Sequence, residues 1–208
     1  MKNGDPIRWF SMHQFLCEHY QHLSDKLEEY LISEINQFSN TINSLGQRSA
    51  REDLNSWALA TLYPNTVRYS MFITLYKQFE YALTEACHEL EKDHPNSEKL
   101  SDLKDKGIRR AHTYLHKVVG IEEPFEPASW QKIKDLNTLR NKIIHNDAII
   151  KTNEKDHINI VKRINVWAPV IIKETRIVLC NNFIKHASQF LYKQTSYVAE
   201  NLRTAGWE

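Results

Sequence analysis

The hydrophobic positions of this chain recur at helical intervals along most of its length. Within residues 7–44, one set of apolar residues recurs every four positions and therefore shares a helix face: Leu23, Leu27, Leu31 and Ile35. A longer stripe within 64–92 follows the i, i+3, i+4, i+7 spacing: Phe72, Leu75, Tyr76, Phe79, Leu83, Ala86, Cys87 and Leu90. Pro64 fits the first turn of this second helix. The same reasoning predicts helices over about 97–119, 130–145 and 179–203, and a short helix or ordered connector over 49–63.

The pattern changes between 147 and 179, where β-branched residues gather, including those of 158–164. A small β-hairpin is expected around 164–179, with its turn near Lys173 and Glu174. The fold class is therefore all-α, a bundle of long antiparallel helices with this hairpin added. One domain over 1–208 is the simplest organisation, with a helical extension at 1–62 and a core at 63–203.

Composition narrows the class of protein. Of 208 residues, 41% are hydrophobic and 25% charged, and the 5 glycines and 6 prolines are few, which favours helices over a turn-rich β architecture. A net charge of +1 is not that of a general nucleic-acid coat, so any contact with nucleic acid would use a local patch. The 3 cysteines lie far apart, the chain starts without a signal peptide, and no apolar run could span a bilayer. We expect a cytoplasmic protein without membrane contact.

The helix expected over 130–145 carries a charge in its apolar stripe. At about 100° per residue, Arg140 falls between the directions of Leu136, Ile143 and Ile144. A guanidinium keeps its proton at any ordinary pH. A buried arginine therefore needs a carboxylate, a phosphate or a water-filled cleft.

A polar ridge runs beside that arginine. Asn137, Asn141 and His145 follow the i, i+4, i+8 spacing and share one side of the helix. An arginine, an amide and an imidazole thus converge on one edge of an apolar face. This arrangement suits the binding of a phosphate and the transfer of a proton.

These residues also have structural interpretations. Arg140 can form an ion pair with Glu80, which flanks the stripe of the 64–92 helix, and such a pair can also hold the arginine in place for catalysis. His145 can simply face the carbonyl groups at the C-terminus of its helix. Asp147 can be part of a helix stop, or it can tune His145.

The spacing Arg-x4-His alone is a weak signal, because it also occurs from Arg8 to His13. The Arg140 copy differs in having Asn141 directly after the arginine and an apolar stripe around it. The context rather than the spacing singles it out.

The segment Arg140-Asn141-Lys-Ile-Ile-His145 resembles the signature of HEPN-domain ribonucleases, in which a polar residue, often asparagine, follows the arginine and a histidine comes shortly after. The helix that bears Glu80 resembles an earlier core helix of that family, which often carries an acidic residue. Two further features are similar to HEPN sequences: the spacing of Trp130, Ile133, Leu136 and Leu139, and the segment 106–115. The resemblance covers about residues 64–200. Some family members have a tyrosine two residues after the histidine, where antitoxins attach nucleotides, but this chain has Asp147 there.

The resemblance implies a HEPN-like bundle that forms a homodimer, so that two Arg…His motifs line one cleft. It implies an endoribonuclease that works without metal or other cofactor, as a toxin or an antiviral effector, with tRNA or mRNA as substrate and an antitoxin or defence-system protein as a further partner. It implies these roles: Arg140 and His145 catalytic with Asn141 assisting, and Glu80, Asn137 and Asp147 supporting. An imidazole can accept the proton of a ribose 2′-hydroxyl or protonate a leaving group, and an arginine stabilises the phosphorane charge.

A basic group precedes this motif and can follow an RNA backbone or simply form a solvated helix face: Lys104, Lys106, Arg109 and Arg110. Two other functions stay open. The chain can be a HEPN module that binds a nucleotide or a protein without cutting, or a structural subunit of a larger complex in which Arg140 is neutralised within its own chain.

Overall fold

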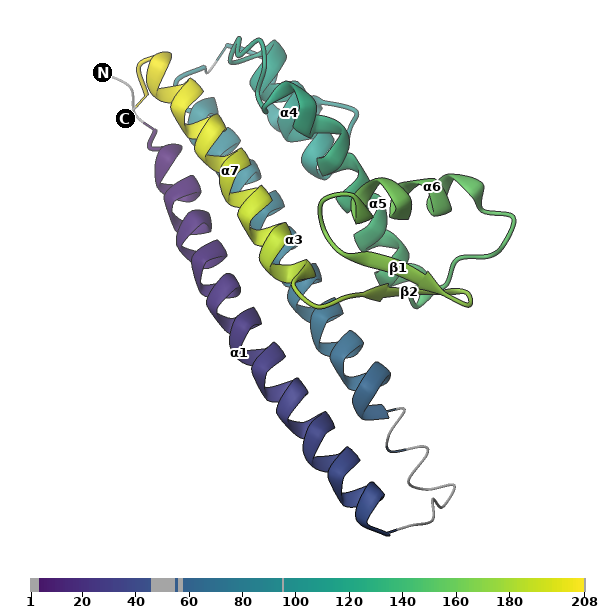
Figure 1. The fold of residues 1–208 in the computed structure, drawn as a ribbon. Coiled ribbons are helices and arrows are strands. Elements are labelled where there is room, and N and C mark those ends of the chain that lie inside the picture. Colours follow the sequence, from purple (N-terminus) through teal and green to yellow (C-terminus); the bar gives the residue numbers. More distant parts are fainter. Residues whose placement is uncertain (1–3, 46–54, 56–57, 95, 208) are drawn as a thin grey trace. The chain divides into compact units, whose positions relative to one another are not determined.

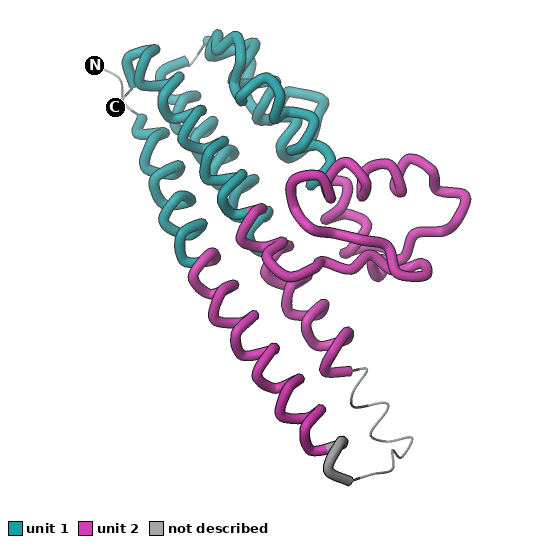
Figure 2. Tube along the Cα trace, viewed as in Figure 1, with its two compact units in different colours: residues 1–19, 74–136, 188–208 teal, residues 20–73, 137–187 magenta. Residues whose placement is uncertain are grey.

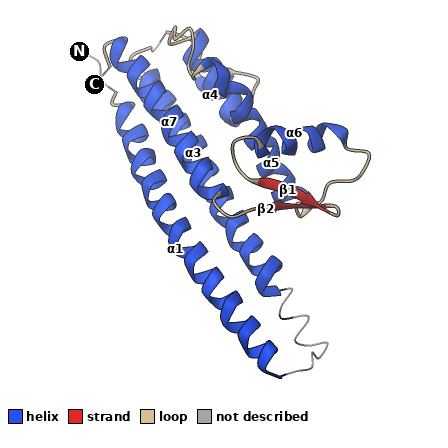
Figure 3. Ribbon diagram, in the orientation of Figure 1, coloured by secondary structure: helices blue, strands red, loops and turns tan. Residues whose placement is uncertain are grey.

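The computed structural model describes residues 4–45, 55, 58–94 and 96–207. The chain is mostly helical with one small hairpin, which confirms the expected all-α class (Figure 3). The α-helices and strands, labelled in Figure 1, are α1 (Ile7–Leu45), α3 (Tyr63–Glu91), α4 (Gly107–Lys117), α5 (Trp130–Asn146), α6 (Lys155–Asn165), β1 (Val170–Lys173), β2 (Arg176–Leu179) and α7 (Phe183–Thr204). Three short elements lie between them: the π-helix η1 (Ala58–Leu62) and the 3-10 turns η2 (Leu100–Asp102) and η3 (Pro127–Ser129). No helix among the described residues is both long enough and apolar enough to cross a membrane.

Four of the predicted helices are confirmed within a few residues, as α1, α3, α5 and α7. The helix predicted over 97–119 was too long, because η2 and a short connector replace its first part and α4 begins only at Gly107. Gly107 has a φ of +55°, in the left-handed region that residues with a Cβ rarely adopt, so a regular helix cannot run through it. A Cβ there would also collide with the carboxylate of Glu80. Most of the piece predicted over 49–63 lies outside the described residues.

The β-branched region contains a confirmed prediction and a helix that was not predicted. The hairpin is present, with β1 and β2 antiparallel and Lys173 paired with Arg176 across the turn. Residues 158–164, however, belong to helix α6. Val161 and Ile164, three positions apart, are both buried there, while the lysine and arginine between them are exposed. Packing of this one apolar face, rather than the β preference of its residues, decides the helical form.

The chain divides into two compact units, coloured separately in Figure 2. The first unit comprises Met1–His19, Thr74–Leu136 and Ser188–Glu208, and the second comprises Tyr20–Ile73 and Asn137–Ala187. Each unit therefore draws on α1, α3, α5 and α7. The expected division at 62/63 stays a prediction.

The first unit is built around the second half of α3. Phe79 contacts both His13 of α1 and Phe125, with ring centroids 5.5 and 6.2 Å apart. Tyr76 donates a hydrogen bond of 3.3 Å to the carbonyl of Ile133 on α5. The α3 residues predicted to form the stripe are buried throughout this half: Leu75, Tyr76, Phe79, Leu83, Ala86, Cys87 and Leu90.

The second unit gathers the hairpin, α6 and parts of the long helices. Arg68 of α3 forms a two-pronged ion pair with Glu28 of α1, with N···O distances of 2.7 and 2.5 Å. Its Nη1 also donates to the carbonyl of Leu179 at 3.0 Å, which ties the end of β2 to both helices. Strand β1, which contacts helix α6, alternates buried Val170 with exposed Ile171. One face of the hairpin therefore lies against the rest of the unit, and the other faces solvent.

Candidate functional site

The C-terminal part of α5 carries the candidate site, but its apolar stripe differs from the prediction. Ile143 is buried, whereas Ile144 is 43% exposed and Arg140 is half-buried. Arg140 therefore lies at the edge of the buried surface and not within it. The reason is that α5 also buries Leu139 and Lys142, which a helical wheel places on the side of the helix facing away from Ile144.

Arg140 and Asn141 are held together directly. The Nη1 of Arg140 donates to the Oδ1 of Asn141 at 2.7 Å. Adjacent residues on a helix diverge by about 100°, so the long arginine side chain bends towards the asparagine to make this bond. Asn141 and His145 are one turn apart on the same side of α5, where Cβ atoms are about 6 Å apart. The hydrogen bond thus draws the guanidinium towards the side of the helix that bears His145.

His145 lies exposed in the last turn of α5. Its ring has no hydrogen bond or ion pair to any of the described residues. The carboxylate of Asp147 makes no such contact within the described part of the chain, and its expected influence on His145 stays a prediction. Asp147 has a φ of 50° and its carbonyl accepts a hydrogen bond of 3.0 Å from Arg176 Nη1, so it shapes the helix stop. Asn137 is half-buried on the same side of α5.

Sequence reasoning missed the ion pair between Lys142 and Glu154. Lys142 is buried, and its Nζ donates to Glu154 Oε1 at 2.7 Å. The hydrogen bond from Lys142, followed by one from the backbone N–H of Lys151, lowers the pKa of the Glu154 carboxyl. A helical wheel puts Lys142 on the polar side of α5, so only the folding of α6 against that side could reveal its burial. The pair links the turn of α5 between Arg140 and His145 to the residue that precedes α6.

Glu80 belongs to the first unit and Arg140 to the second. The carboxylate of Glu80 lies against Gly107 at the start of α4, in the space that any side chain at that position would need. Glu80 thus lies beside the first residue of α4. The ion pair expected between Glu80 and Arg140 stays a prediction.

The four basic residues predicted to bind RNA do not form one helix face. Lys104 and Lys106 are exposed on the connector that precedes α4, and Arg109 is exposed on α4 itself. Arg110 is half-buried, and its Nε donates to the carbonyl of Asp105 at 2.6 Å. Arg110 lines a cavity together with residues of α3 and η2, and the other three basic residues do not line it.

A second buried pair of chemical interest, His13 and Cys17, lies on α1. The Cys17 Sγ is 3.6 Å from each ring nitrogen of His13. Burial lowers the pKa of His13 to about 4 and, with the nearby Glu18 charge, raises the pKa of Cys17 to about 12. At neutral pH the pair is a thiol and a neutral imidazole, so Cys17 is not an activated nucleophile.

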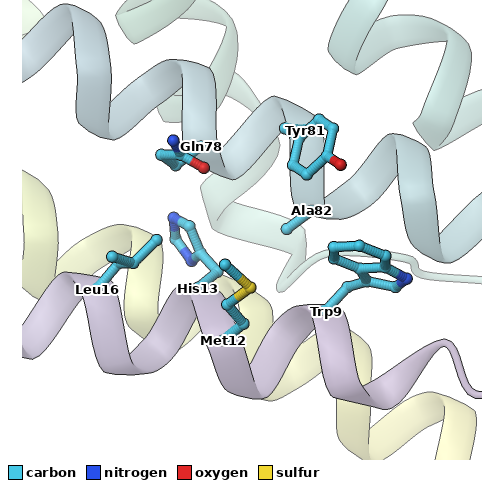
Figure 4. Close-up of a pocket in the computed structure, with 7 residues that line it drawn as sticks. All are labelled: Trp9, Met12, His13, Leu16, Gln78, Tyr81 and Ala82. Carbon is cyan, nitrogen blue, oxygen red and sulfur yellow. The ribbon is translucent and has the colours of Figure 1, made fainter.

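The pocket beside His13 is too small for a substrate. Figure 4 shows His13 with Trp9, Met12 and Leu16 of α1 facing Gln78, Tyr81 and Ala82 of α3. Its cavity of about 10 Å³ holds a single water at most. The histidines of α1 also belong to no group of three His, Cys, Asp or Glu side chains able to hold a metal ion, and no such group occurs elsewhere in the described part of the chain.

No protein-family model, curated protein or solved structure matches this chain. The family resemblance therefore rests on the motif residues quoted above. For function, the physical observation is the grouping of Arg140, Asn141 and His145 at one end of α5.

Proposed function

We propose that this protein is a metal-independent endoribonuclease whose catalytic residues are Arg140 and His145, assisted by Asn141. The observation that carries the proposal is the hydrogen bond of 2.7 Å from Arg140 Nη1 to Asn141 Oδ1, on the helix turn that leads to exposed His145. It directs a permanent positive charge towards an imidazole that solvent, and hence a substrate, can reach. Phosphate binding and proton transfer are thereby available at one helix end.

In the proposed reaction the ribose 2′-oxygen attacks the adjacent phosphorus. The O2′–P bond forms, the P–O5′ bond breaks, and the products carry a 2′,3′-cyclic phosphate and a 5′-hydroxyl. One imidazole accepts the 2′-hydroxyl proton, and a second donates a proton to the leaving 5′-oxygen. Arg140 stabilises the charge that develops on the non-bridging oxygens. The need for a 2′-hydroxyl makes the reaction specific for RNA.

The need for two imidazoles supports a homodimer. A single chain presents one His145, and five residues of helix turn its direction by about 140° from that of Arg140. A second copy facing α5 would supply the second imidazole and close the site from the other side. The exposure of Ile144 and Ile149, at 43% and 38%, leaves apolar surface next to His145 that such a partner can cover.

The test is RNA cleavage by the purified full chain in the presence of EDTA. Arg140→Ala and His145→Ala should each lower the rate by about 100-fold or more, because each removes a group that acts in the transition state. Arg163→Ala and His186→Ala, which remove an exposed arginine and an exposed histidine of the same unit, should leave the rate within about twofold of wild type. Undiminished cleavage by His145→Ala would refute the catalytic assignment.

A non-catalytic role as a nucleotide- or protein-binding module is the second candidate. It is favoured by the lack of any described residue that orients the ring of His145, since catalytic imidazoles are commonly fixed by a hydrogen bond to the second nitrogen. This function predicts RNA or nucleotide binding that depends on Arg140 without any product bearing a cyclic phosphate. Mass spectrometry of the RNA ends after incubation separates the two functions.

A further inference from the structure

The first unit contains a cavity that neither the motif on α5 nor the proposed reaction uses. Its volume is about 170 Å³, more than ten times the roughly 10–15 Å³ that one water requires. Its walls come from the second half of α3, from η2 and from the beginning of α4: Thr84, His88, Leu100, Ser101, Gly107, Arg110 and Ala111. It therefore has room for a small anionic group.

The two ionisable side chains that line this cavity are both basic. Arg110 is anchored by its Nε, which donates to the Asp105 carbonyl at 2.6 Å. Its Nη1 and Nη2 have no hydrogen-bond or ion-pair partner among the described residues. An arginine held in this way keeps a fixed pair of donors available, the geometry that binds two oxygens of one phosphate.

His88 is oriented as well. Its Nδ1 lies 3.1 Å from Glu91 Oε2, a contact that favours a proton on that nitrogen. When the ring carries both protons, Nε2 supplies a further donor, and the described residues offer it no partner of their own. The hydroxyl of Ser101, which donates to Asp102 at 3.1 Å, can rotate to face a ligand.

The carboxylates of Glu91 and Glu80 lie close to the cavity but do not line it. Glu91 faces His88 and accepts a hydrogen bond from the backbone N–H of Leu100. Glu80 lies against Gly107 without lining the cavity. Because the negative charge of Glu80 is near the cavity, replacing Glu80 with glutamine should strengthen the binding of an anion. The direction of this change tests whether the cavity binds negative charge.

From this geometry we propose that the cavity between α3, η2 and α4 is a phosphate-binding site, with Arg110 as its bidentate donor and His88 as a second donor. Two sources can supply the phosphate: a free phosphate or small phosphate ester, or the terminal phosphate of an RNA chain. The second source rests on the proposed function, whereas the binding of phosphate itself does not.

The first experiment is isothermal titration of the full chain with inorganic phosphate at constant ionic strength. Wild type should show saturable binding at one site, Arg110→Gln should weaken it by about tenfold or more, and His88→Gln should weaken it less. Arg109→Gln is the matched control, since it removes the same charge from the next residue of α4, which does not line the cavity. Glu80→Gln should tighten binding. The proposal is overturned by absence of saturable binding in wild type, or by equal weakening in Arg109→Gln and Arg110→Gln.

The second experiment distinguishes the sources. It compares two RNA oligonucleotides of one sequence, with and without a 5′-phosphate, binding to the His145→Ala chain so that no cleavage intervenes. A preference for the phosphorylated RNA that disappears in Arg110→Gln assigns the site to RNA ends, and equal affinity assigns it to a free phosphate. Arg110→Lys keeps the positive charge but loses the pair of parallel N–H donors, so it should bind inorganic phosphate more weakly than wild type. Circular dichroism checks that each variant is folded. Phosphate binding without RNA cleavage would support this site while refuting the ribonuclease.

Discussion

The two units bury polar side chains in different ways. In the first unit, the interior holds groups that burial keeps neutral, such as His13 with its pKa lowered to about 4 and Cys17 with its pKa raised to about 12. In the second unit, the interior holds charge pairs. Arg68 and Glu28 face each other with side chains only 12% and 9% exposed, and Lys142 reaches Glu154 from a buried position.

The first unit also has a buried acid, but in another setting. Glu89 pairs with Arg8 and Lys92, whose side chains are 55% and 53% exposed, so solvent screens both partners. A neutral buried group costs free energy when it must take up a proton, whereas a buried charge costs free energy when it loses its partner. The first unit should therefore be sensitive to acid and the second to the loss of a single charge.

The largest expected effect tests the second unit. Glu28→Gln leaves the Arg68 guanidinium buried without its carboxylate and should lower the free energy of unfolding by about 3 kcal/mol. The measurement is urea unfolding, combined with hydrogen exchange of peptides from the two units. Faster exchange should appear first in peptides from Tyr20–Ile73 and Asn137–Ala187.

The control for Glu28→Gln is Glu29→Gln, which breaks the exposed pair between Lys26 and Glu29 on the same helix. That change should alter the free energy of unfolding by less than about 1 kcal/mol. Equal losses in the two variants would mean that burial of the Arg68 pair has no energetic consequence.

The second prediction tests the first unit with pH. Burial lowers the pKa of His13 from 6.5 to about 4, so the unfolded chain binds this proton more readily than the folded chain. The resulting stabilisation is present above pH 6.5 and is lost as the pH falls towards about 4. At about 1.4 kcal/mol per pKa unit, it amounts to about 3 kcal/mol.

The measurement for His13 is the free energy of unfolding at pH 7 and at pH 4.5. His13→Gln should depend less steeply on pH than wild type over this interval, because its side chain does not titrate. His19→Gln makes the same change at an exposed site on α1 and should keep the wild-type slope. Parallel slopes for wild type and His13→Gln would contradict the neutral burial of this ring.

The smallest expected effect concerns a single neutral hydrogen bond in the second unit. The Tyr69 hydroxyl donates to the carbonyl of Ile177 in β2, and burial raises the pKa of Tyr69 to about 12 despite the opposing charge of Arg176. Tyr69→Phe should cost about 1 kcal/mol in thermal or urea unfolding, less than Glu28→Gln. A loss as large as that of Glu28→Gln would remove the distinction between neutral and charged contacts in this unit.

Local patterns predicted most elements correctly, and the errors have identifiable causes. The stripe on α3 needed only helical periodicity, and its residues are buried as expected. The start of α4 coincides with Gly107, whose positive φ is not contained in the spacing of apolar positions. Helix α6 was missed because its β-branched residues suggest strand until the packing of one face is known.

The sequence indicated which residues of α5 make up the candidate site, but not which of the residues around them are buried. The order Arg140, Asn141, His145 on one helix follows from the sequence, and the hydrogen bond between the first two fits their proximity. The exposure of Ile144 and the buried pair of Lys142 with Glu154 could not be predicted, because a helical wheel gives directions on α5 without saying which of them other elements cover.

The sequence by itself therefore determined the four longest helices, the hairpin and the residues that can carry chemistry, because helical periodicity and turn chemistry act over a few neighbouring positions. The tertiary structure alone decided which polar groups are buried and how they are matched. It made His13 neutral, gave Arg68 a carboxylate 40 positions away, and put the basic side chain of Arg110 into a cavity while leaving that of Arg109 in solvent. These outcomes depend on solvent exclusion by distant segments, and desolvation is not a property of any short stretch of sequence.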